Sequence, residues 1–185
     1  MGESRFVRRI PQGEDRERLT CADCGFIAYE NPKVVVGSVV TGDDGRILLC
    51  RRAIDPRAGF WTLPAGYLEM GETVAEGAKR EAWEEARAHI ALDGVLAVYS
   101  IARIGQVQVI FRARLAAPGF EPGPESLEVR QFGWDAIPWG EIAFPSVHWA
   151  LHAWRAAASG PVPAAVLNPE GADGWRLPPA PAAGL

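Results

Sequence analysis

The sequence predicts an α/β fold in which a mixed, largely antiparallel sheet is covered by helices on both faces. Three observations lead to this prediction. Short β-branched and apolar runs are separated by turn residues, a well-capped helix lies at mid-chain, and an apolar helix lies near the end. Antiparallel strands with one central and one late helix favour an α/β/α sandwich.

Three strands are predicted before the central helix. The valine-rich run at 33–41 ends in the turn sequence Thr-Gly-Asp-Asp-Gly and is followed by the run at 46–52, so we expect a hairpin. A shorter strand at 60–63 leads into the loop Pro64-Ala-Gly66.

The central helix should begin just after Glu72. Thr73 followed by Glu76 is a capping-box pattern, in which the hydroxyl and the carboxylate each accept a hydrogen bond from a free backbone N–H. Small apolar residues then recur at helical spacing, which predicts a helix that packs closely against the sheet.

Three further strands and a second helix are predicted after the central helix. The strands cover 95–104, 106–115 and 127–134, the first two being joined at a glycine. The second helix covers 142–158 and should be interrupted near Pro145, because proline lacks the backbone N–H that a helix interior needs.

The central helix carries a cluster of carboxylates. Glu81, Glu84 and Glu85 are i, i+3 and i+4 neighbours and therefore lie on one face of the helix. Like charges at these spacings destabilise a helix by roughly 0.2–0.5 kcal/mol for each pair, and only Glu84 has a basic partner one turn back, Arg80. A hard divalent cation would compensate the cluster, and a solvated acidic helix face is the alternative.

The loop and helix together fit a spaced motif, which reads G-x5-E-x7-R-E-x-x-E-E from Gly66 to Glu85. In this motif the sequence resembles the Nudix hydrolases, whose shared fold is the α/β/α sandwich predicted above. One position departs from the family pattern, because Arg87 stands where the motif has its last glycine. Arg87 either takes a strained left-handed backbone or lets the helix continue toward His89.

The resemblance implies hydrolysis of a nucleoside diphosphate linked to another moiety, with water attacking one phosphorus of the pyrophosphate. It implies Mg²⁺ or Mn²⁺, which would neutralise phosphate oxygens and lower the pKa of a coordinated water. The metal ligands that it implies are Glu81, Glu84 and Glu85, with the carbonyl of Gly66 as a further candidate.

The resemblance also implies the catalytic residues. Arg80 and Glu72 would form an orienting ion pair beside the metal ligands. The general base would be Glu81 or a glutamate outside the motif, for which we favour Glu128, also as a metal ligand, because it lies six residues before a tryptophan as in related pyrophosphatases. Glu125 is the alternative, and a loop carboxylate without a catalytic role is the other reading of both.

The pattern Cys21-Ala-Asp-Cys24 resembles one knuckle of the zinc ribbon that precedes the hydrolase domain in similar family members. Structural zinc needs four ligands, and residues 1–20 hold neither cysteine nor histidine. Three interpretations stay open: a ribbon remnant without metal, a chain start placed too far downstream, and zinc shared across a dimer. We favour the first two and do not expect zinc bound within one chain.

The chain is therefore divided into three parts. Residues 1–32 are a degenerate zinc-ribbon segment, 33–158 are the hydrolase domain, and 159–185 are a tail. The tail is predicted from composition, because 161–185 hold six of the 15 prolines together with alanine and glycine.

Composition and charge limit the setting of the protein. The chain has 185 residues, of which 48% are hydrophobic and 23% charged, as in an ordinary soluble domain. The net charge of −4 argues against a nucleic-acid surface, whereas bound cations would still admit an anionic dinucleotide. No secretory or transmembrane stretch is found, so we expect a cytoplasmic protein without a membrane partner.

Beyond the motif, the sequence resembles FAD pyrophosphatases and the related ADP-ribose and NADH pyrophosphatases. The resemblance covers about residues 21–150 and includes Gly59-Phe-Trp-Thr-Leu-Pro-Ala-Gly66 and Gly123-Pro-Glu-Ser-Leu-Glu128. It implies FAD or ADP-ribose as substrate. NADH and capped RNA rank lower, because the signature of NADH pyrophosphatases after the motif is absent.

Substrate contacts are expected from arginines and aromatic rings near the loop. Guanidinium groups suit phosphate and rings suit stacking, which singles out Arg51, Arg52, Trp61 and Tyr67. A surface ion pair or a core aromatic is the alternative for each of them, and Trp61 in particular lies in a strand.

Two expectations concern the protein as a whole. By family analogy we expect a homodimer. A function from another class, a sensor that binds ADP-ribose or another nucleotide without cutting it, is the alternative to an enzyme. The three intact glutamates argue against such a sensor, and Arg87 and the incomplete ribbon argue for it.

Overall fold

The computed structural model describes residues 5–157, 160–162, 164–172 and 174. The chain forms two compact units, Met1–Pro32 and Lys33–Leu185, each described here by itself. The first unit is a three-stranded antiparallel sheet in the order β1-β2-β3, with strands β1 (Phe6–Arg9), β2 (Arg18–Cys21) and β3 (Ile27–Ala28).

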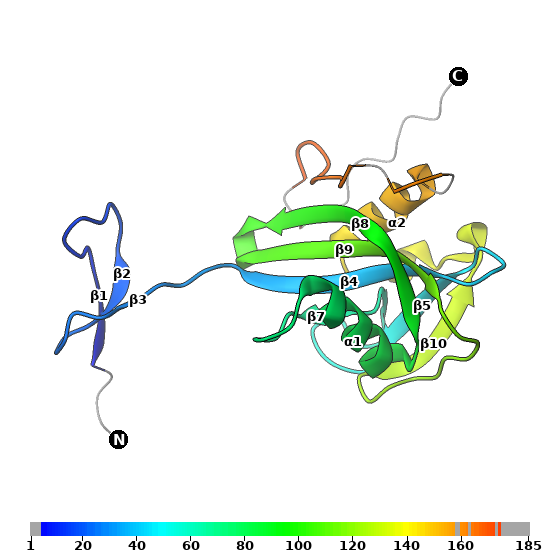
Figure 1. Cartoon of the computed structure of the whole chain (residues 1–185), viewed down its shortest axis with the longest axis horizontal. Coiled ribbons are helices and arrows are strands. Elements are labelled where there is room, and N and C mark those ends of the chain that lie inside the picture. Colours follow the sequence, from blue (N-terminus) through cyan, green and yellow to red (C-terminus); the bar gives the residue numbers. More distant parts are fainter. Residues whose placement is uncertain (1–4, 158–159, 163, 173, 175–185) are drawn as a thin grey trace. The chain divides into compact units, whose positions relative to one another are not determined.

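The second unit is built on a seven-stranded sheet, in which the main path runs β10-β5-β4-β9-β8 (Figure 1). Its strands are β4 (Lys33–Thr41), β5 (Ile47–Arg52), β6 (Trp61–Thr62), β7 (Ala65–Tyr67), β8 (Ile90–Ile101), β9 (Gln106–Leu115) and β10 (Ser126–Phe132). Among the named strands of the described residues, β4 and β9 are the one parallel pair, so the predicted mixed and largely antiparallel sheet is confirmed.

Helices cover both faces of this sheet, as predicted (Figure 1). Helix α1 (Val74–Ala86) packs its alanines on one face, in one cluster with Val40 and Leu48. Helix α2 (Pro145–Ala156) packs on the other face with Val39 and Ile47. Neighbouring residues of β4 therefore pack against different helices, because successive side chains of a strand point to opposite faces of the sheet.

Short 3₁₀ turns complete the connections of this unit. They are η1 (Ala102–Ile104), η2 (Trp134–Ala136) and η3 (Trp139–Glu141). Strand β8 begins at Ile90, five residues before its predicted start, and ends where η1 begins, because the hairpin to β9 closes through that turn.

The predicted interruption of the second helix was wrong. Pro145 is the first residue of α2, where its missing N–H costs nothing because the first four amides of a helix have no partner within it. The residues just before it, Ile142 to Phe144, lead into the helix instead of forming part of it.

The sheet opens between β4 and β5. The two strands are Cα partners only at Thr41 and Ile47, after which β4 pairs with β7 and β5 pairs with β6. The predicted hairpin is thus present, but its two strands diverge after a single pair of residues. This separation leaves a gap in the sheet, and the residues of β7 and α1 that carry the motif lie at that gap.

Part of the C-terminal segment, which was predicted as a Pro/Ala-rich tail, contacts the sheet in its described residues. Val166 adds to the edge of β8, donating to Leu96 O at 2.9 Å and accepting from Val98 N at 2.9 Å. The side-chain amide of Asn168 forms two hydrogen bonds with the backbone of Ser100. Its Oδ1 accepts from Ser100 N at 2.8 Å, and its Nδ2 donates to Ser100 O at 2.9 Å. Residues 175–185 of the predicted tail lie outside the described residues.

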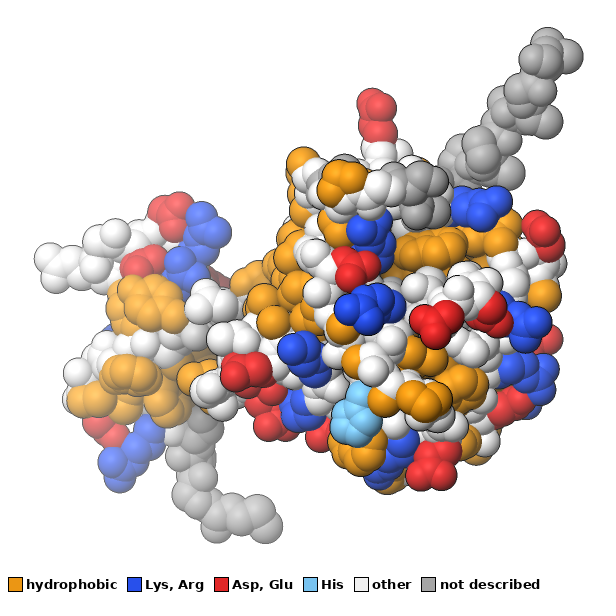
Figure 2. Space-filling model, turned by 45° about the vertical axis from the view of Figure 1, so that its right-hand side comes forward, with side chains coloured by type: hydrophobic (Ala, Val, Ile, Leu, Met, Phe, Trp, Pro, Cys, Tyr) orange, Lys and Arg blue, Asp and Glu red, His pale blue; other side chains and the backbone are white. Residues whose placement is uncertain are grey.

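In the part of the chain that the structure describes, no helix combines the length and the apolar character needed to cross a bilayer. On the face of the molecule in Figure 2, acidic and basic side chains are interspersed.

Candidate active site

A cavity of about 1540 Å³ opens at the gap in the sheet of the second unit. Its walls come from β7, α1, the start of α2, the ends of β8 and β9, and the loop that precedes β10. Five glutamates and arginines of α1 and its flanks reach it, namely Arg80, Glu81, Glu84, Glu85 and Arg87. The cavity therefore contains the motif and much more space than the motif alone requires.

The local sequence explains why α1 starts and ends where it does. Thr73 Oγ1 accepts from Glu76 N at 3.2 Å and Thr73 N donates to Glu76 Oε2 at 2.8 Å, so the predicted capping box is present. Arg87 ends the helix in a left-handed conformation with φ of 49°. Of the two outcomes left open for Arg87, the structure shows the strained backbone.

Arg80 connects the motif carboxylates. It donates to Glu72 through two N–H groups, and its Nη1 lies 2.7 Å from Glu81 Oε1 and 2.8 Å from Glu84 Oε2. Its Nη2 also donates to the carbonyl of Tyr67 at 2.9 Å. These contacts hold the helix against the loop, and Arg80 lowers the pKa of Glu72 to about 2.

Glu81 and Glu85 are buried, at 7% and 5% exposure, although each would carry a charge. Burial raises the pKa of Glu85 to about 8, and the nearby Glu81 and Glu125 add to the shift. Burial also raises the pKa of Glu81. Glu85 Oε2 accepts from Ala65 N at 3.1 Å, so this carboxylate spans the gap between helix and loop.

Two glycines allow the elements to approach one another around these carboxylates. A Cβ on Gly66 would lie 2.5 Å from the carboxylate of Glu81, and a Cβ on Gly123 would lie 1.6 Å from the carbonyl oxygen of Glu84. Gly123 N donates to Glu85 O at 3.0 Å, so the loop before β10 satisfies the carboxyl end of α1.

The two candidate glutamates outside the motif differ in their placement. Glu125 lines the cavity beside the α1 carboxylates, whereas Glu128 does not. A bulge between Ser126 and Glu128 sets Glu128 opposite Arg51, where its carboxylate contacts Arg130 and lies 3.9 Å from Arg51. Sequence spacing alone could not reveal this bulge.

The four predicted substrate contacts differ in their placement. Tyr67 is half exposed and lines the cavity, as does Arg52, whose guanidinium carbon lies 5.2 Å from the Phe144 ring centroid. Arg51 lies outside the lining and donates to Gly59 O at 2.9 Å. Trp61 is 4% exposed and packs edge-on against Phe132 in the core, so its ring is not available for stacking.

Sequence analysis missed several residues of the cavity wall. Gln106 and Gln108 on β9 and Phe144 before α2 all line it. The alternation of glutamine with valine at 106–109 was a usable signal, since it marks one polar and one apolar face of the strand.

In the first unit, Cys21 and Cys24 lie at the turn between β2 and β3, where Gly25 N donates to Cys21 O at 3.1 Å. Backbone hydrogen bonds from Cys24 and Asp23 lower the pKa of Cys21. Within residues 5–157 and the described C-terminal stretches, no three His, Cys, Asp or Glu side chains form a ready metal-binding group. The turn thus offers two of the four ligands that structural zinc requires.

Comparison with known proteins agrees with this fold. The NUDIX domain model matches residues 31–180, and the model of the Nudix N-terminal zinc ribbon matches residues 3–30. The chain therefore belongs to the Nudix family. The family match at the N-terminus includes Cys21 and Cys24.

Individual proteins show the same relationship. An ADP-ribose pyrophosphatase from Methanocaldococcus jannaschii is 30% identical over 144 residues, which are 76% of this chain and 79% of that protein. A MutT-like protein from Streptomyces ambofaciens is 41% identical over 81 residues, 44% of this chain and 51% of that protein, so the match spans about half of this relative. A NUDIX hydrolase structure from Nitrosomonas europaea aligns with a TM-score of 0.81 and 43% identity, covering 88% of this chain and 93% of that one.

Proposed function

We propose that this chain hydrolyses the pyrophosphate bond of a nucleoside diphosphate derivative with the help of Mg²⁺ or Mn²⁺, with ADP-ribose or FAD as the first candidate substrates. The observation that carries the proposal is the set of four glutamates at one end of a cavity large enough for a dinucleotide, Glu81, Glu84, Glu85 and Glu125.

The donor set fits a hard divalent cation. Carboxylate oxygens are the ligands that Mg²⁺ and Mn²⁺ prefer, and two of the four carboxylates are buried, Glu81 beside Arg80 and Glu85 with a pKa that burial and neighbouring carboxylates raise. Arg80 donates to Glu81 Oε1 and to Glu84 Oε2, so the second oxygen of each carboxylate would be the one to face a cation. The candidate ligands are Glu81, Glu84, Glu85 and the Gly66 carbonyl, joined by Glu125.

When bound, the cation would neutralise the phosphate oxygens and make a coordinated water more acidic. The protein would supply the remaining functions. Arg80, fixed by Glu72, would orient the carboxylates, and Glu125 or Glu81 would accept the proton of the attacking water. Arg52 and Tyr67 lie at the cavity wall, where they would contact the nucleotide. Arg51, Trp61 and Glu128 are no longer part of the proposal.

The substrate order rests on chemistry and similarity together. The name of the Methanocaldococcus relative supports ADP-ribose, and the resemblance between residues 21 and 150 supports FAD. NADH remains the second alternative. The cytoplasmic location and the homodimer stay predictions, and light scattering of the purified protein would test the dimer.

Product analysis tests the function. The full chain is incubated with ADP-ribose, FAD, NADH and a nucleoside triphosphate, each with Mg²⁺, Mn²⁺ or EDTA, and a Glu84→Gln/Glu85→Gln variant serves as the control. We expect AMP with ribose 5-phosphate or FMN, formed only with metal and only by the unaltered chain.

Two other outcomes would change the conclusion. If ADP-ribose raises the melting temperature but yields no product under any metal condition, the protein is a nucleotide sensor instead of an enzyme. If product forms equally in the double variant, the α1 glutamates do not carry the reaction.

A further inference from the structure

Part of the cavity wall consists of three uncharged polar side chains that belong to different strands. Tyr67 comes from β7, and Gln106 and Gln108 come from β9. Val35 of β4 is the Cα partner of both Tyr67 and Gln108, so these two residues lie in one row across three strands. The row faces the cavity, since Val35 also lines it.

The three side chains form a hydrogen-bonded series. Gln106 Nε2 donates to Tyr67 Oη at 3.1 Å, and Gln108 Nε2 donates to Gln106 Oε1 at 3.3 Å. The hydrogen bonds of the described residues leave the Tyr67 O–H and the Gln108 carbonyl oxygen directed to no protein group. The series therefore offers both donors and an acceptor to a bound molecule, namely the Tyr67 O–H, the second N–H of each glutamine and the Gln108 carbonyl oxygen.

Packing of the sheet does not require glutamine at these positions. On the opposite face of β9, Val109 and Phe111 pack in the cluster beneath α1. On the cavity face, the next residue in the alternation is Ile110, which is buried in the α2 cluster. Strand β9 is thus apolar at Ile110, which lies in the α2 cluster, and amide-bearing at Gln106 and Gln108, which line the cavity.

The row begins directly beside the candidate reaction site. Tyr67 follows Gly66, where an added Cβ would lie 2.5 Å from the Glu81 carboxylate, and the Tyr67 carbonyl accepts from Arg80. A group bound along Tyr67, Gln106 and Gln108 would consequently share the cavity with a phosphate held at the glutamates.

We propose that Tyr67, Gln106 and Gln108 form a subsite for the hydroxyl groups of a ribose in the substrate. This proposal rests on the proposed function. Neutral groups that both donate and accept match hydroxyls, whereas a terminal phosphate would be matched by guanidinium forks. The subsite would make the protein select sugar-bearing diphosphates, with Gln108 as its innermost contact.

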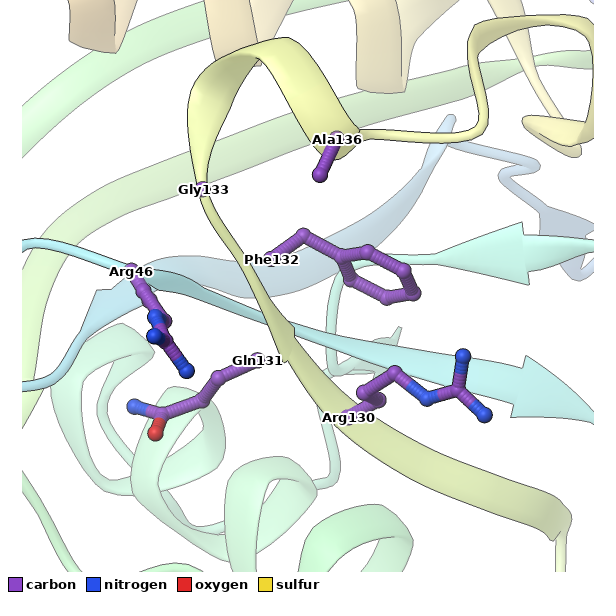
Figure 3. A pocket seen from close by; sticks show the side chains of 6 residues that line it. All are labelled: Arg46, Arg130, Gln131, Phe132, Gly133 and Ala136. Carbon is purple, nitrogen blue, oxygen red and sulfur yellow. The ribbon is translucent and has the colours of Figure 1, made fainter.

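Three ligands test this subsite: ADP-ribose, its 2′,3′-dideoxyadenosine analogue, and the O-butyl ester of ADP, which has no second sugar. We measure kcat/KM and calorimetric Kd with Mg²⁺ for the unaltered chain and for Gln108→Met, which keeps the side-chain length and removes both hydrogen-bonding groups. Gln131→Met on β10 is the matched control, because Gln131 lines a separate pocket of about 470 Å³ with Arg46 and Phe132 (Figure 3).

We expect Gln108→Met to lower kcat/KM for ADP-ribose, or to raise its Kd, about three- to tenfold. This is the cost of losing one or two uncharged hydrogen bonds. The effect should disappear with the one analogue that lacks the contacted hydroxyls, and Gln131→Met should leave all values unchanged. An equal loss for all three ligands, or no loss with ADP-ribose, would overturn the subsite.

Failure of the hydrolysis proposal can be distinguished from failure of the subsite proposal by measuring both turnover and Kd. Binding without turnover in the unaltered chain would contradict hydrolysis, while the Kd series would still decide the subsite. Turnover of ADP-ribose at the unaltered rate by Gln108→Met would contradict the subsite alone. If the unaltered chain neither binds nor cleaves any of the three ligands, the subsite proposal is wrong, and the product analysis with FAD and NADH decides the proposed function separately.

Discussion

Arg80 and Glu72 form a two-point ion pair, with Arg80 Nε 3.0 Å from Glu72 Oε2 and Nη2 2.8 Å from Glu72 Oε1. The planar guanidinium uses its remaining groups for Glu81, Glu84 and the Tyr67 carbonyl. One arginine thus joins the loop, the helix and the candidate ligands, and the first prediction follows from this arrangement.

Replacing Arg80 by lysine should lower kcat/KM for the best substrate about 10- to 100-fold, the usual cost of losing a group that orients metal ligands. Lysine keeps the charge but cannot form the two-point pair. Steady-state kinetics over a Mg²⁺ series measures the effect. Activity within about twofold of the unaltered chain would show that only the charge at position 80 matters.

Glu125 and Glu128 form a matched pair for the second prediction. Glu125→Gln should reduce kcat at least about 100-fold if Glu125 accepts the proton of the attacking water. Glu128→Gln should change kcat less than about threefold, because the Glu128 carboxylate is a surface ion-pair partner of Arg130 outside the cavity. The reverse order of the two variants would restore Glu128 as the catalytic glutamate.

Gly123→Ala should destabilise the fold by about 3 kcal/mol, since the added methyl would overlap the Glu84 carbonyl and force the loop from α1. Urea unfolding measures this change in the free energy of unfolding. Gly133→Ala is the control: no atom lies within 4 Å of the added Cβ there, and its φ of −65° suits alanine. Equal values for the two variants would contradict the close contact at Gly123.

Arg87→Gly should stabilise the protein by about 0.5–1 kcal/mol, because glycine adopts the left-handed conformation at the end of α1 without strain. The gain is limited by the loss of the Arg87 side-chain contacts with Trp83, among them a hydrogen bond of 3.3 Å to its carbonyl. Thermal unfolding of this variant beside Arg87→Ala checks the effect. The Arg87→Ala variant should not be stabilised, since the Cβ of alanine makes the left-handed backbone unfavourable, as it does for arginine.

The N-terminal unit should hold no stoichiometric zinc within one chain, because Cys21 and Cys24 supply two ligands and tetrahedral zinc needs four. Elemental analysis of protein purified with zinc in the buffer measures the metal content. One zinc per chain that is lost in Cys21→Ser/Cys24→Ser would contradict this prediction, and one zinc per two chains would indicate a site shared in a dimer.

Local features were the ones that the sequence predicted best. The start of α1 follows from Thr73 and Glu76, and the motif lies within a continuous stretch around them, so neighbouring residues determine both. The α/β/α layers were also predictable, because strand alternation and helix spacing each mark which side faces the core.

Features that depend on distant pairing were not predictable. A bulge against β5 sets Glu128 opposite Arg51, while Glu125 lines the cavity, and no spacing reveals this difference in placement. Trp61 lies in the core because β6 is covered by Phe132 of β10, seventy-one residues later in the chain. The docking of the proline-rich C-terminal segment depends likewise on the open edge of β8, since composition describes a segment by itself and not its neighbours.

The position of Val166 on β8 has a consequence for assembly. An unpaired outer strand can recruit the same strand of another molecule, and a sheet that carries one is prone to aggregate. Here the chain's own C-terminal segment occupies the backbone groups of Leu96 and Val98. A protein shortened before Val166 would present these groups to solvent, and strand addition between molecules would then compete with correct association.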